Sequence, residues 1–105
     1  MEAVMQIHLI EKEKRFTCIC KTSKSWESGF WKVSIKVAEG LIGGDIFLHT
    51  AQVMPSYFGG KITGYHIQDS GAWQGRVIFH FTATSEHKSV KTSKSGWGME
   101  KKIVR

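Results

Sequence analysis

The chain has 105 residues, of which 41% are apolar and 23% are charged, a balance that suits one packed domain and excludes a disordered chain. No apolar run approaches the roughly 18–20 residues that cross a bilayer, and the first fifteen residues lack the basic start of a secretory signal. The formal net charge of +6 favours a polyanionic partner such as nucleic acid. We therefore expect a single cytoplasmic domain over residues 1–105, without membrane contact.

The first part of the chain contains short segments with a strand pattern. Residues 4–10 alternate loosely between apolar and polar, and Phe16–Cys20 is rich in strand formers, so both are predicted strands. Residues 21–29 are polar apart from one tryptophan and are predicted to form a loop. Residues 31–42 alternate as in a strand, but their apolar positions also fall near helical spacing, with Gly43 as a helix stop. The pattern leaves strand and helix open for this segment.

The central block, residues 43–67, holds two apolar runs that each follow a pair of glycines. The pairs are Gly43-Gly44 and Gly59-Gly60, and glycine tolerates both a positive φ and a close approach of another backbone. We therefore expect tight reversals at both pairs. The predicted strands that follow them are residues 45–50 and residues 61–68.

The last third of the chain adds two more predicted strands. Residues 69–75 contain Asp, Ser and two Gly and are predicted to turn. Residues 76–84 form the clearest strand, and Lys101–Val104 form a short last one. About six or seven short strands with at most one helix predict a mainly β, α+β domain that forms a small closed or partly closed β-barrel. The core positions expected in the clearest strand are Val77, Phe79 and Phe81.

Basic residues gather toward the C-terminus, where Glu100 is the one acid after residue 87. Lysine side chains in such a segment can neutralise phosphates, and each neutralised phosphate makes binding more sensitive to salt. The alternative is a solvated basic segment that keeps the protein soluble. The lysines predicted to contact a nucleic-acid backbone are Lys88, Lys91, Lys94, Lys101 and Lys102.

The cysteines and histidines do not predict a metal site. Cys18 and Cys20 would share one face of a strand, a spacing that rarely forms an unstrained disulfide, and no second cysteine pair exists for zinc. His49, His66 and His80 come from separate predicted strands, and nothing in their spacing requires a shared metal. We expect reduced thiols, no metal and no cofactor.

The order of elements resembles that of the PUA-like barrels, particularly their EVE and ASCH branches. The matching positions are Ala38, Leu41, Gly44-Asp45, residues 46–49 (IFLH) and residues 60–64 (GKITG). The resemblance covers residues 31–81, about half the chain, and departs from the family at residues 51–59, where EVE-like chains have a shorter connection. It implies a helix within residues 31–41 and a pocket for a nucleobase or modified nucleotide of RNA or DNA.

A ligand site is predicted around the polar loop that follows His49. The two nitrogens of a histidine can donate and accept near neutral pH, and an aromatic ring such as that of Tyr57 can stack on a base. Tryptophans on loops fit a ligand surface or a lid over the barrel end. The structural alternatives are a histidine bonded to a loop carbonyl and aromatic rings that cap the core. The predicted ligand contacts are Trp26, His49, Thr50, Gln52, Ser56, Tyr57 and Trp97.

The sequence thus favours a small binding module that recognises a nucleotide or nucleic acid, with no catalytic residue assigned. A second hypothesis is a small hydrolase of ASCH-like type that uses Glu39, Lys61 and Thr63. A third is an interaction or accessory domain that forms a homodimer, with its tryptophans buried against the partner. Salt-dependent oligonucleotide affinity, turnover and a doubled mass in solution would distinguish the three.

Overall fold

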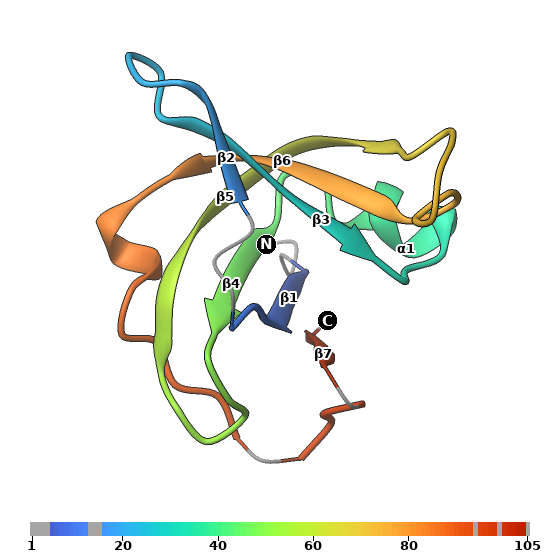
Figure 1. The fold of residues 1–105 in the computed structure, drawn as a ribbon. Coiled ribbons are helices and arrows are strands. Elements are labelled where there is room, and N and C mark those ends of the chain that lie inside the picture. The colour runs from blue at the N-terminus through green and yellow to red at the C-terminus, as the bar shows by residue number, and fades with distance from the viewer. Residues whose placement is uncertain (1–4, 13–15, 94, 99, 105) are drawn as a thin grey trace.

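The computed structural model describes residues 5–12, 16–93, 95–98 and 100–104 of the chain. Within this part, seven strands form one sheet that curls into a partly closed barrel (Figure 1). The protein is mainly β with one short α-helix, as the sequence predicts. The strands are β1 (Gln6–Ile10), β2 (Phe16–Cys20), β3 (Ser25–Trp31), β4 (Asp45–His49), β5 (Ser56–Ile67), β6 (Val77–Ala83) and β7 (Lys101–Val104). The helices are α1 (Ile35–Gly40) and the 3-10 helix η1 (Ser85–His87).

The strands lie in the order β2-β3-β6-β5-β4-β1-β7 across the sheet. Neighbouring strands are antiparallel except β1 and β4, which run parallel with Ile7 beside Ile46 and Leu9 beside Leu48. Because β7 pairs with β1, strands from the two ends of the chain lie side by side at one edge of the sheet. None of the helices in the described residues combines the length and the apolar character that a membrane crossing requires.

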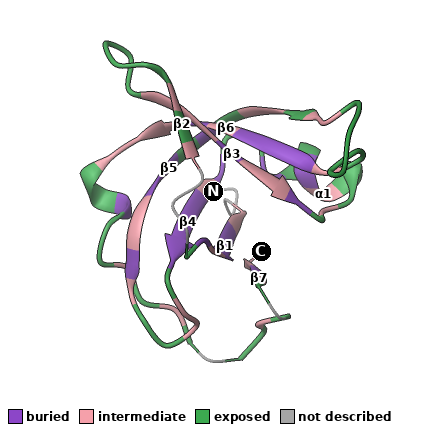
Figure 2. Cartoon of the chain, viewed as in Figure 1, coloured by how far each residue is buried: buried purple, intermediate pink, exposed green. Residues whose placement is uncertain are grey.

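The inner surface of the curled sheet holds the hydrophobic core. Successive side chains of a strand point to opposite faces, so alternate residues of each strand are buried here. In β6 these are Val77, Phe79 and Phe81, as predicted, and each is at most 1% exposed. Figure 2 shows the buried residues along β4 and β6. The core residues of β1, β4 and β5 are Ile7, Leu9, Ile46, Leu48 and Ile62.

The ambiguous segment 31–42 is divided between two elements. Its first residue, Trp31, ends β3, and the helix α1 begins at Ile35. The hydroxyl of Ser34 accepts a hydrogen bond from the Val37 backbone N–H at 3.2 Å and caps the helix. The helix implied by the PUA-like resemblance is therefore present, although it spans only six residues. Ala38 on the inner side of the helix and Leu41 directly after the helix are both fully buried in the core.

The prediction of a loop over residues 21–29 is wrong, because β3 begins at Ser25. β3 pairs with β2 on one side and with β6 on the other, so its backbone hydrogen bonds are satisfied within the sheet. Trp26 packs against Phe58 from β5, with 5.2 Å between the ring centroids. Long-range pairing and this aromatic contact therefore outweigh the polar local composition.

The expected reversal at Gly59-Gly60 is also wrong, because both glycines lie inside β5, which already begins at Ser56. A Cβ at Gly59 would overlap the carbonyl oxygen of Ile46, and one at Gly60 would overlap that of Thr82. Glycine is thus required for the close approach of neighbouring strands. The reversal expected at the first pair is present, since Gly43 has a φ of +85° just before β4.

Candidate functional site

The face of β1 and β4 that points away from the core carries polar and aromatic side chains. His8 lies on β1, while Asp45, Phe47 and His49 alternate along β4 with the core residues between them. The rings of His8 and Phe47 are stacked, with 4.6 Å between their centroids. His8 and His49 are at most 1% exposed. We refer to His8, His49, Asp45 and His87, the last from η1, as the histidine network.

His8 and His49 form a buried, hydrogen-bonded pair. His49 Nδ1 donates to the Met54 carbonyl at 2.9 Å, which leaves its Nε2 to accept from His8 Nδ1 at 2.9 Å. Gln6 Oε1 lies 3.4 Å from His8 Nε2, and a flip of the side-chain amide would turn its N–H toward that nitrogen instead. Burial, together with His49 and Lys102, lowers the pKa of His8 to about 4, and burial lowers the pKa of His49. Both rings are therefore neutral at pH 7.

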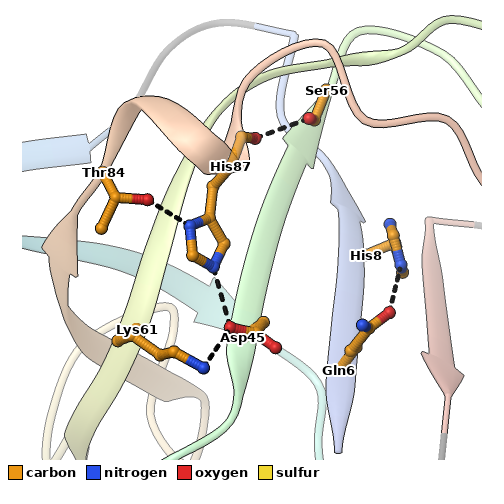
Figure 3. Close-up of polar contacts among 7 residues, drawn as sticks. All are labelled: Gln6, His8, Asp45, Ser56, Lys61, Thr84 and His87. Carbon is orange, nitrogen blue, oxygen red and sulfur yellow. Dashed lines mark hydrogen bonds and ion pairs between the residues drawn. The ribbon is translucent and has the colours of Figure 1, made fainter.

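Asp45 and His87 join η1 to the sheet (Figure 3). His87 Nε2 donates to Asp45 Oδ1 at 2.8 Å, and its Nδ1 accepts from the Thr84 hydroxyl. Lys61 donates to the same Asp45 oxygen at 2.9 Å. Burial alone would raise the pKa of Asp45, but the hydrogen bonds from His87 and Lys61 outweigh it and hold this pKa below its usual value. Asp45 is therefore an anion bound by two donors.

A threonine, a histidine and an aspartate in contact have the composition of a nucleophilic relay. Here Thr84 lies three residues before His87 in the chain, at the start of η1. The adjacent chain is also fixed, because Ser56 Oγ donates to the His87 carbonyl at 2.6 Å and accepts from the Val90 N–H at 3.0 Å. Neither of the two cavities described below is lined by these residues. We therefore assign these contacts to anchoring the segment after β6 on the sheet.

Lys102 anchors residues 92–93, which lie further along the segment after β6. Its ammonium group donates to Thr92 Oγ1 at 2.7 Å and to the carbonyl and hydroxyl of Ser93 at 2.8 and 3.0 Å. The side chain is buried, and its three N–H groups are all used. Trp97 then lies edge-on to His49, with 5.6 Å between the ring centroids. The indole N–H of Trp97 is buried and meets no acceptor among the described residues.

The predicted ligand residues fall into separate groups. Trp97 packs against His49 of the histidine network. Trp26 and Tyr57 instead pack around Phe16, at 5.6 and 6.2 Å between ring centroids, and Tyr57 donates to the Glu11 carbonyl at 2.5 Å. Burial and the charge of Glu11 raise the pKa of Tyr57 to about 12. The remaining predicted contacts are Thr50, which is exposed, Gln52, which is half-buried, and Ser56, which is buried.

The predicted phosphate-binding lysines also differ in their surroundings. Lys88 and Lys91 are exposed, whereas Lys102 is buried under its three hydrogen bonds. Lys101 is half-buried, and its ammonium donates to the Lys32 carbonyl at 2.5 Å. Lys94 lies outside the described residues. Among the described residues of this group, only Lys88 and Lys91 therefore have an exposed side chain.

The three residues of the hydrolase hypothesis have different partners. Lys61 is bound to Asp45, and Glu39 accepts from the Tyr65 hydroxyl at 3.4 Å. Thr63 is exposed at the irregularity between Ile62 and Gly64 in β5. The three side chains therefore do not share a partner in the described residues, and none of them lines either of the two cavities described below.

Two adjoining cavities, of about 220 and 340 Å³, form a second candidate site. The larger volume reaches the lower end of the roughly 300–1,000 Å³ found for small-molecule sites. Residues Phe30, Trp31, Arg76 and Glu100 line both cavities, so we treat them as one aromatic groove. The other lining residues are Ile10, Glu11, Lys12, Gly29, Lys32, Trp73, Gly98 and Lys101.

Planar side chains are stacked in this groove. The rings of Phe30 and Trp73 lie parallel within 8°, with 5.8 Å between their centroids. The Arg76 guanidinium lies 5.4 Å from the centroid of the Trp73 ring. Trp31 is 8% exposed, and its indole N–H donates to Ser28 Oγ at 3.0 Å, which fixes the ring. Trp73 is 42% exposed and offers the most accessible ring surface of the three.

Sequence reasoning missed this groove, because it treated residues 69–75 as a simple turn. The groove depends on the register that places Trp31 beside Val77, which brings the end of β3 to Arg76 and to the turn that holds Trp73. The one signal in the sequence is that Trp73 stands three residues before Arg76 in a chain with four tryptophans. This spacing does not indicate which strand packs beside the turn that holds Trp73.

Comparisons with known proteins add no relative. The chain matches no family model, no curated protein and no solved structure. Its function therefore has to be inferred from the chemistry of its own residues, above all the histidine network and the aromatic groove.

Proposed function

We propose that the protein is a binding module for a nucleotide or nucleic acid and that the ligand binds in the aromatic groove. One observation carries the proposal: at a cavity, the Phe30 ring stacks on Trp73 and the Arg76 guanidinium lies over the Trp73 ring. A base stacked on an aromatic ring contributes roughly 1–3 kcal/mol of binding free energy. His49, the centre of the site expected from the sequence, is fully buried and already bonded, so the groove is the better location.

Charge supports the same location. Lys12, Lys32 and Lys101 line the groove together with Arg76, and the whole chain carries a net charge of +6. Such groups attract phosphates and make affinity fall with salt. Glu100 also lines both cavities, and a carboxylate accepts hydrogen bonds from the amino group of a base such as cytosine. The groove therefore suits a base with an exocyclic amino group and a flanking phosphate.

The PUA-like character belongs to this proposal, together with RNA or DNA as the nucleic acid and a cytoplasmic location. Its support is the order of elements on which the resemblance was based, with Ala38 and Leu41 in and after a helix that precedes β4. Single-stranded ligands fit best, because their bases are free to stack on Trp73.

Fluorescence anisotropy with labelled single-stranded RNA and DNA at about 50 mM salt tests the proposal. Trp73→Ala is expected to weaken binding roughly 5- to 150-fold, the equivalent of one lost base stack. Lys32→Gln is expected to reduce the slope of log affinity against log salt by roughly 0.7. Lys36→Gln, an exposed lysine on the nearby helix α1, is the matched control and should leave the slope unchanged.

Two results would contradict the proposal. If Trp73→Ala binds as well as the unaltered protein while Lys88→Gln or Lys91→Gln weakens binding, the ligand contacts the segment after η1 instead. If no oligonucleotide binds and sedimentation gives twice the 11.9 kDa mass until Trp73 is replaced, the groove is a surface for a second copy of the chain.

A further inference from the structure

Three potential metal ligands converge on the face of the sheet that points away from the core, where β3, β6 and β5 lie side by side. Glu27 of β3 is directly opposite His80 of β6 in the strand pairing. On the other side of β6, Gly64 is opposite His80, and His66 lies two residues further along β5. Side chains at such positions share a face and come within reach of one another.

The ligand atoms are close enough for one ion. His66 Nδ1 and His80 Nε2 are 2.6 Å apart, and His80 Nε2 is 3.9 Å from Glu27 Oε2. One ligand atom from each of the three residues lies within 4.8 Å of the other two. Zinc bonds to nitrogen and oxygen ligands are about 2.0–2.2 Å long, so small side-chain rotations would place all three atoms around one ion.

The surroundings of the cluster suit a cation that keeps an open coordination position for water or substrate. The side chains of Glu27 and His80 are 34% and 35% exposed, and His66 is exposed, so an ion can enter from solvent. Gly64, beside His80, has no atom within 4 Å of where a Cβ would lie, which leaves space next to the cluster. The carboxylate supplies a negative charge that offsets part of the charge of a divalent ion.

We propose that Glu27, His66 and His80 bind a divalent transition-metal ion, with zinc as the reference ion. Two imidazoles and one carboxylate are the ligand set of sites that leave positions open for water or substrate, in contrast to closed structural sites of four ligands. The site rests on residues that do not line the aromatic groove, so it stands independently of the nucleotide proposal. The sequence predicts no metal, because the strand register that joins these residues is not visible in their spacing.

Isothermal titration with zinc sulfate, in a buffer without chelating components, tests the site. The protein should carry Cys18→Ser and Cys20→Ser, because both cysteines are free and Cys20 is exposed. We expect one ion per chain. Glu27→Gln, His66→Ala and His80→Ala should each weaken binding by more than the 10- to 100-fold that loss of a second-shell partner costs. Glu86→Gln, an exposed carboxylate on η1, is the matched control and should bind as before.

Cobalt provides a second measurement that does not depend on heat signals. Co²⁺ in the same site should give visible absorption bands that disappear in His66→Ala, while circular dichroism shows the same fold. Failure of the parent protein to bind zinc and cobalt at millimolar concentration would overturn the proposal. Binding that persists in a His66→Ala, His80→Ala double variant would also overturn it and would assign the ion to other residues.

Discussion

Two histidine pairs in this chain each form a ring-to-ring hydrogen bond but lie in opposite surroundings. His8 and His49 are hydrogen-bonded at 2.9 Å and almost completely buried, with the Lys102 ammonium near enough to affect His8. His66 and His80 are hydrogen-bonded at 2.6 Å near the surface, with a carboxylate beside them. Burial disfavours a positive charge on the first pair, whereas the second pair is accessible to solvent and has a carboxylate beside it. The environment of a histidine pair, more than its geometry, therefore decides what the pair can do.

The two pairs differ in their surroundings because a segment of the chain covers the polar face of the sheet at one pair and leaves it partly open at the other. His8 and His49 lie under the segment after β6, which Lys102 and Ser56 hold in place through several hydrogen bonds. The face that carries His66 and His80 remains partly open, and Gly64 leaves space beside it. The same sheet thus presents a covered polar face at β1–β4 and an accessible one at β3–β6–β5.

The largest expected effect concerns acid and the buried pair. Between pH 6.5, the ordinary pKa of histidine, and about pH 4, the pKa of His8 in the fold, the unfolded chain binds more protons than the folded one. The free energy of unfolding is therefore highest above pH 6.5 and falls by about 3 kcal/mol as the pH drops to 4, at 1.36 kcal/mol per pKa unit. His49, whose pKa is also lowered, acts in the same direction. Urea unfolding at pH 7.5 and 4.5 measures the difference.

A variant of His8 tests the source of this acid sensitivity. His8→Gln removes the titrating ring and should flatten the pH dependence. If His8→Gln does not fold, the pKa of His8 measured by NMR in the unaltered protein replaces the comparison. An ordinary pKa near 6.5 for His8 would contradict the prediction.

Strands with regular apolar alternation could be predicted from the sequence because their pattern is local. Residues 76–84 were expected and β6 spans Val77–Ala83, with the three predicted core residues inside. β3 was missed because its sequence SWESGFW shows no such alternation, and only the pairing with β2 and β6 makes it a strand.

The candidate sites were less predictable because they depend on register. The distance between His66 and His80 follows from an irregularity in β5 between Ile62 and Gly64, which shifts the pairing with β6. A shift of one residue moves every later side chain to the other face, and no spacing rule reveals it. The sequence identifies His49 as a polar strand end, but the structure packs it against Trp97, which lies about fifty residues further along the chain.

An intermediate effect is expected from Lys102, which hydrogen-bonds Thr92 and Ser93 and whose charge lowers the pKa of His8. Lys102→Met should lower the free energy of unfolding by about 1–3 kcal/mol, because hydrogen bonds from a charged donor to Thr92 and Ser93 are lost. It should also raise the pKa of His8, since the charge of Lys102 lowers it. NMR titration and urea unfolding measure the two effects. Lys101→Met is the matched control, and an equal rise in the His8 pKa there would contradict the assignment to Lys102.

The smallest effect is expected from Glu27→Gln in the absence of metal. The carboxylate lies 3.9 Å from His80 Nε2 and is a third exposed, and even a fully charged pair at such an exposed position contributes only about 0–1 kcal/mol. The free energy of unfolding should therefore change by less than about 1 kcal/mol when a chelator removes metal. Zinc binding, measured without the chelator, should still be weakened. A destabilisation of about 3 kcal/mol without metal would mean that Glu27 belongs to a structural polar network. The two histidine pairs would then serve the same purpose, and the contrast between the covered and the open face of the sheet would disappear.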